Sequence, residues 1–145
     1  MLQVVSATTT TPTTIATTTL TDTTITATIT PTLATSKVLI LITYCIDFNV
    51  SGVRDMEGKG RLLRGGTTLQ DYVNNFFGSQ QTVAYSVGTY ILEGQNSIHY
   101  LDSPATTSAT TYKLQAAPEN TVSGRSYRFQ TTNGPSNITL FEIGA

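Results

Sequence analysis

The sequence is poor in charge. Only 12% of its 145 residues are charged, and the formal net charge is −1. This charged fraction is about half that of a typical globular protein. A protein that binds nucleic acid needs a basic surface to neutralise phosphates. The composition therefore excludes nucleic acid as an expected partner.

Residues that carry chemistry are equally scarce. The chain has one Cys and one His, so we expect neither an intrachain disulfide nor a zinc site, which needs several such ligands. There is no Gly-x-Ser-x-Gly motif, and His99 lies between Ile98 and Tyr100 on a predicted strand. We interpret Cys45 as a small buried hydrophobe and His99 as a structural or interface residue.

Motifs for cofactors are missing too. Residues 64–68 lack the Lys and the Gly spacing of a phosphate-binding loop. Asp55 and Glu57 lack the spaced ligand series of a calcium loop, and we interpret them as part of a solvated turn. Paired carboxylates of the glycosidase kind are a spatial arrangement that the sequence leaves open. We expect no catalytic residue, no cofactor and no metal, and therefore no enzyme.

One apolar run stands out, over residues 37–48. Its apolar part is about half as long as a membrane-spanning helix, and residues 1–5 lack the basic and apolar regions of a signal peptide. We therefore expect no membrane partner. The run is dense in β-branched and aromatic residues, which favours a strand.

Side chains on a strand alternate between its two faces. One alternating set of this run is expected to line a core: Val38, Ile40, Ile42, Tyr44, Ile46 and Phe48. The opposite set begins with Leu39 and Leu41, which are also apolar. A strand that is apolar on both faces needs a second cover, from another layer, a neighbouring subunit or the chain's own N-terminal arm.

Thr is the commonest residue and dominates the N-terminal part of the chain. We predict that residues 1–20 form an extended Thr-rich arm that docks as a strand on another surface, and that residues 21–145 form one domain. The predicted contacts with another subunit or with a capsid are Leu2, Val4, Val5, Leu39 and Leu41.

Short alternating segments separated by turn residues make up the rest of the chain. The expected strands are residues 24–30, 61–64, 82–87, 89–92, 98–101, 110–116, 125–131 and 138–143. Residues 69–77 differ, because Leu69, Tyr72, Val73, Phe76 and Phe77 have the spacing of an amphipathic helix. The sequence thus predicts an all-β, antiparallel, jelly-roll-like β-sandwich with one short helix.

Several segments resemble a family of small β-structured virion proteins of tailed bacteriophages. The matching segments are residues 1–7, 26–31, 36–40, 100–107, 111–115 and 138–145. The resemblance implies a jelly-roll-like domain, usually trimeric, on the virion surface. Such domains occur at the tips of tail fibres and as proteins that decorate the capsid, and no catalytic residues come with them.

The sequence begins its predicted domain close to Met1 and has no heptad pattern for a fibre stalk. We therefore favour a homotrimeric capsid decoration, or cement, protein on the outer surface of the capsid, with the major capsid protein as its partner. The alternative is a receptor-binding tail-fibre or spike tip that adsorbs to host polysaccharide through polar loops at residues 74–75 and 80–81. A carbohydrate-active enzyme or sugar-binding module is the third hypothesis.

Overall fold

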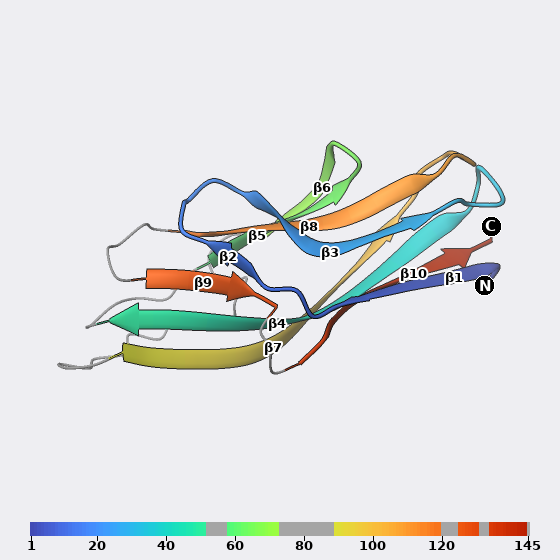
Figure 1. Ribbon diagram of the computed structural model, residues 1–145. Helices are drawn as coiled ribbons and strands as arrows, with labels where there is room; N and C mark the ends of the chain where they lie inside the picture. Colours follow the sequence, from blue (N-terminus) through green and yellow to red (C-terminus); the bar gives the residue numbers. More distant parts are fainter. Residues whose placement is uncertain (52–57, 73–88, 120–124, 131–133, 145) are drawn as a thin grey trace.

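The computed structural model describes residues 1–51, 58–72, 89–119, 125–130 and 134–144. These residues form ten strands and no helix (Figure 1). The strands are β1 (Gln3–Thr9), β2 (Thr13–Ile15), β3 (Thr21–Ile29), β4 (Lys37–Ser51), β5 (Gly58–Arg64), β6 (Thr67–Tyr72), β7 (Thr89–Asp102), β8 (Thr110–Pro118), β9 (Arg125–Phe129) and β10 (Ser136–Ile143).

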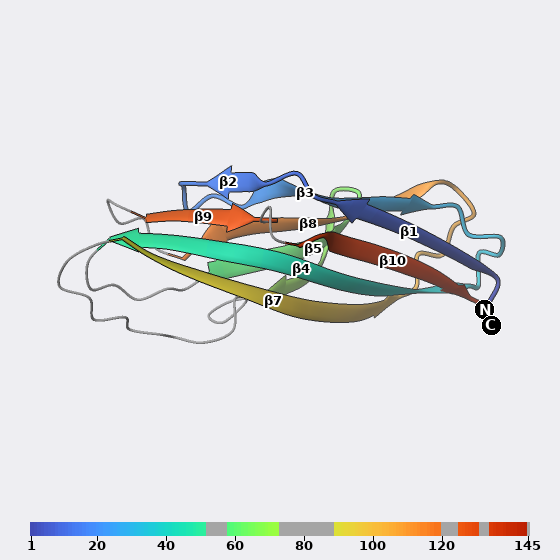
Figure 2. The same cartoon turned by 60° about the horizontal axis from the view of Figure 1, so that its bottom comes forward.

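Two antiparallel sheets pack against each other as a β-sandwich (Figures 1 and 2). The first sheet has the order β1-β10-β4-β9-β2, with β7 on the other edge of β4, and the second has the order β3-β8-β5-β6. β4 organises the first sheet. β7 pairs with it from Val38 to Ser51, while β10 and β9 share its opposite edge, at residues 37–43 and 46–50.

The pairing of the strands is nested. β1 and β2 pair one after the other with β10 and β9, which themselves pair one after the other with β4. Counting β1 with β2 as one position and β9 with β10 as another, the ten described strands fill eight positions in the two sheets. In chain order the first position pairs with the eighth, the second (β3) with the seventh (β8), the third (β4) with the sixth (β7), and the fourth (β5) with the fifth (β6). The chain is therefore arranged as one long hairpin whose two arms are wrapped into two sheets.

The core lies between the sheets and confirms the predicted inner face of β4. Val38, Ile40, Ile42, Tyr44 and Ile46 are buried, with exposures of 2% or less. The side chain of Phe48 lies outside the described part of the structure. The second sheet contributes Ile25, Ala27 and Ile29 from β3 and Tyr112 and Leu114 from β8, which lie in the alternating segments expected at residues 24–30 and 110–116.

The predicted helix is wrong over its first turn. Residues 67–72 form β6, which pairs with β5 through a hairpin at Gly65 and Gly66. Cross-strand pairing and burial of Leu69 and Tyr72 against the core override the local helical spacing. The remainder of that prediction, residues 73–78, lies outside the described residues, as do the predicted strand at residues 82–87 and the carboxylates Asp55 and Glu57.

The N-terminal segment differs from the expected arm. Residues 3–9 form β1, an edge strand of this chain's own first sheet, in register with β10 from Gln3↔Glu142 to Thr9↔Ser136. Burial alternates along β1, and its inward-facing Val5 and Ala7 pack against the core of the same chain. Docking on another surface is not needed to order it.

Candidate interaction surface

Within the described ranges, no group of three or more His, Cys, Asp or Glu side chains is placed so that it could hold a metal ion. His99 is exposed on β7 opposite Leu41, and Cys45 is half-buried on β4. Within the same ranges no helix is long and apolar enough to cross a membrane. The exposed surface of the sandwich, by contrast, carries a cluster of apolar side chains.

The outer side of the first sheet carries a row of four apolar residues, one from each neighbouring strand. The pairing register places Val4 beside Phe141, Phe141 beside Leu39, and Leu39 beside Leu101. We use the name apolar face for this row and its outward-facing neighbours, which are Leu2, Val4, Leu39, Leu41, Leu101, Phe141 and Ile143. The face lies at the end of the sandwich where both termini are found (Figures 1 and 2).

Exposure concentrates on the apolar face. Seven large hydrophobic side chains are exposed among the described residues, and five of them belong to it: Leu2, Val4, Leu41, Leu101 and Ile143. Leu101 is 50% exposed and Leu41 is 40% exposed. Single exposed apolar residues are common, but a contiguous cluster marks an interaction surface. The apolar face is therefore our candidate functional site.

The same side of the sheet becomes polar farther along the strands. Ser6 donates to Asn137 Oδ1 at 2.9 Å and lies 3.1 Å from the Thr139 hydroxyl. Asn137 in turn donates to the Thr8 hydroxyl at 3.0 Å. These groups satisfy one another and tolerate water. The outer side is thus divided into an apolar half and a hydrogen-bonded polar half.

Four of the five predicted contact residues meet on the apolar face: Leu2, Val4, Leu39 and Leu41. Val5 does not, because its side chain points inward and packs against the core. β1 also does not lie over Leu39 and Leu41, since it continues the sheet sideways and adds Val4 to the same face. Leu101, Phe141 and Ile143 also lie on this face but are not among the predicted contacts, although their places in alternating segments were the available signal.

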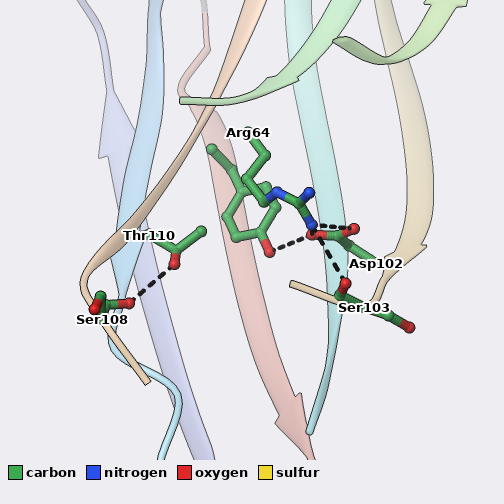
Figure 3. A network of polar contacts seen from close by, with 6 residues as sticks. Arg64, Asp102, Ser103, Ser108 and Thr110 are labelled. Atoms are coloured by element: carbon green, nitrogen blue, oxygen red, sulfur yellow. Dashed lines mark hydrogen bonds and ion pairs between the residues drawn. The ribbon is translucent and has the colours of Figure 1, made fainter. Parts of the chain in front are cut away.

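A polar cluster closes the sandwich near the apolar face (Figure 3). Arg64 Nη1 on β5 donates to both carboxylate oxygens of Asp102 on β7, each at 2.9 Å. The Tyr112 hydroxyl on β8 donates to Asp102 Oδ2 at 2.7 Å. Burial, and then the hydrogen bond to Asp102, raises the pKa of Tyr112. This cluster joins the two sheets, and the Arg64, Asp102 and Tyr112 side chains serve as hydrogen-bond partners for one another.

Glu142 anchors the loop between β3 and β4. Its buried Oε1 accepts hydrogen bonds from the Thr32 amide at 2.7 Å, the Thr32 hydroxyl at 2.7 Å and the Leu33 amide at 3.4 Å. Burial raises the pKa of this carboxyl, but the hydrogen bonds outweigh burial and hold the pKa below its usual range.

Glu142→Gln is expected to reduce the loss of stability in acid. A carboxyl with a lowered folded-state pKa stabilises the fold above its unfolded pKa, about 4.3 for Glu, and this contribution disappears as the pH falls through the folded value. Gln keeps an oxygen acceptor for Thr32 but does not titrate. The free energy of unfolding, measured by urea unfolding between about pH 5 and pH 2, should fall less steeply with decreasing pH in the variant than in the native chain.

Asp22 also contributes to the loss of folding stability in acid, and the Glu142→Gln variant does not remove its contribution. Hydrogen bonds from Lys113 at 2.5 Å and Gln115 at 2.6 Å lower the pKa of Asp22, so it contributes to the same pH range. The Glu142→Gln variant should therefore still lose part of its free energy of unfolding as the pH falls. Identical slopes in the variant and the native chain would contradict the anchoring role of Glu142.

No family model matches this chain, and no curated protein matches it.

Proposed function

We propose that this chain is a structural protein of a bacteriophage virion, a homotrimer that decorates the outer surface of the capsid and is not an enzyme. The observation that carries the proposal is the apolar face, where five large hydrophobic side chains are exposed together. A surface of this kind is stable in water when a partner covers it.

The nested strand pairing supports a jelly roll as the finer description of the fold. A jelly roll has eight strands in two sheets and is common among viral capsid and lectin domains. Here the eight strand positions pair first with eighth, second with seventh, third with sixth and fourth with fifth. The fold alone does not imply the function, so the face has to provide the argument.

A second copy of the chain is a suitable cover for the apolar face. The apolar face itself contains no charged residue, and Lys37, beside Ile143, lies at its margin. Two such faces can therefore approach without repulsion between like charges. Three copies with their faces turned toward a common axis would bury all of them, and the rest of the sandwich would remain free to contact the capsid.

The tail-tip alternative depends on the polar loops at residues 74–75 and 80–81, which lie outside the described residues. The apolar face does not favour a tail location over a capsid location, so the alternative remains a prediction. Imaging of labelled particles distinguishes the two locations, because the label lies on the head in one case and on the tail in the other.

Two measurements test the proposed function. Sedimentation equilibrium of the purified chain should give a trimer at micromolar concentration, and antibody labelling of intact particles should mark the head. A monomer at every accessible concentration would contradict trimeric assembly. Labelling of the tail alone would replace the capsid proposal with the tail-tip alternative.

A further inference from the structure

One flank of the sandwich combines an unprotected strand edge with a hollow. β1 and β3 are the edge strands of their sheets on this flank, and each pairs on one side only within the described part of the chain. An edge strand exposes unpaired N–H and C=O groups, which another strand can use. Native proteins commonly protect such edges with charge, proline, bulges or short length.

β1 has none of these protections. Its residues from Gln3 to Thr9 include no charge and no proline, and no charged side chain occurs before Asp22. The other edge strands are protected: the sequence of β7 includes Glu93 and Asp102, that of β6 includes Asp71, and β3 has a register shift next to Asp22. β2 is only three residues long. β1 is therefore the edge best suited to pair with another strand.

A cavity of about 190 Å³ opens beside β1, between it and β3. Ala7 and Thr9 of β1, Thr24 and Ile25 of β3, and Ile138 of β10 line it. The two edges are tied together on either side of Ala7, by Gln3 Nε2 donating to the Thr30 carbonyl and by Thr9 donating to the Thr24 hydroxyl. The small Ala7 side chain leaves the middle of the flank unfilled. The hollow is open to solvent and Thr residues make up much of its lining, and its volume is large enough to admit an aliphatic side chain.

The sequence of β1 is complementary to itself in the antiparallel direction. Pairing two copies with Ser6 opposite Ser6 matches all seven residues of the strand. In this register Val5 of one copy lies opposite Ala7 of the other, on the inner side where the hollow is found. Val4 lies opposite Thr8 on the outer side. The interface thus contains two equivalent pairs, each formed by the branched Val5 side chain of one copy and the small Ala7 side chain of the other.

We propose that the free edge of β1 is a twofold contact for a second copy of this chain, in which the β1 strands pair antiparallel about Ser6 and Val5 of each copy lies opposite Ala7 of the other, at the margin of its hollow. Main-chain hydrogen bonds along a strand edge provide affinity, and the hollow provides selectivity for the register. The contact is isologous, as expected of a twofold interface. It goes beyond the proposed function, because it uses the margin of the first sheet and requires neither a capsid nor the apolar face.

Site-directed cross-linking tests the register. In a Cys45→Ala background, which removes the only native cysteine, we introduce Ser6→Cys, Val4→Cys or Thr8→Cys. Directly opposite Cβ atoms lie about 4.5–5.5 Å apart, close to the separation that a disulfide bridges. Ser6→Cys should give linked dimers under mild oxidation. Thr8→Cys should link at least tenfold less alone, but should link to Val4→Cys when the two variants are mixed. Because Val4 lies on the apolar face, cross-linking of Val4→Cys alone is measured only with that face disrupted by Leu41→Lys and Leu101→Lys.

A blocking variant provides the matched control. Ala7→Lys places a charge at the hollow and should reduce cross-linking of the Ser6→Cys chain at least tenfold, whereas Leu33→Lys, in the exposed β3–β4 loop, should not. Cross-linking of Ser6→Cys should also persist when the apolar face is disrupted, which separates this contact from the trimer. The proposal is overturned if Ser6→Cys links no faster than Thr8→Cys alone, whatever the oligomeric state.

Discussion

Replacing Asp102 by Ala is expected to lower the free energy of unfolding by about 3 kcal/mol. Breaking a buried ion pair from one side costs about 3–5 kcal/mol when the remaining charge stays buried. Arg64 is partly exposed, with 28% of its side chain accessible, so water recovers some of this cost. The Tyr112 hydroxyl, on a side chain that is 0% exposed, loses its acceptor, which adds about 1–3 kcal/mol.

Asp71→Ala is the matched control for this prediction. Asp71 also pairs with an arginine, Arg61, at 2.5 Å, but its side chain is 48% exposed. Exposed pairs contribute about 1 kcal/mol or less. Thermal unfolding at one protein concentration should show a decrease of about 10 °C for Asp102→Ala and a small change for Asp71→Ala. Equal effects of the two variants would show that the cluster in Figure 3 does not hold the sheets together.

The double substitution Leu41→Lys and Leu101→Lys is expected to weaken trimer formation by at least 100-fold and to leave the domain folded. Both side chains are exposed in the single chain, at 40% and 50%, so each substitution should change folding stability by about 0.5 kcal/mol or less. In the proposed trimer the same positions are covered. Burying two ammonium groups per chain, close to those of the neighbouring copies, opposes assembly strongly.

Leu33→Lys is the control for the apolar face. Leu33 is 49% exposed, as exposed as Leu101, but lies in the loop between β3 and β4 and not on the face. It should leave the sedimentation coefficient unchanged, while the double variant should sediment as a smaller species. Circular dichroism should show the same strand content for both. Native assembly of the double variant would exclude the apolar face as the subunit contact.

The alternation along β4 determined which side chains enter the core. A strand has a period of two residues, so once residues 37–48 were recognised as a strand, the faces of Val38 and Ile40 and of Leu39 and Leu41 followed. The alternating segments expected at residues 24–30 and 138–143 likewise contain Ile25 of β3 and Leu140 of β10, which are both buried in the core. The scarcity of charge, Cys and His likewise limited the expected chemistry before any fold was known.

The identity of the neighbours was decided only by the tertiary structure. Leu39 lies between Phe141 and Leu101, which are far away in the chain, because nested pairing brings β10 and β7 to the two edges of β4. Residues 3–9 pair with β10 for the same long-range reason, although their composition suggested an arm that docks on another surface. A local pattern states which way a side chain points but contains no information about the strand beside it. The sequence therefore indicates which apolar side chains of each strand point outward. That these side chains form one continuous surface follows only from the order of the strands in the sheet.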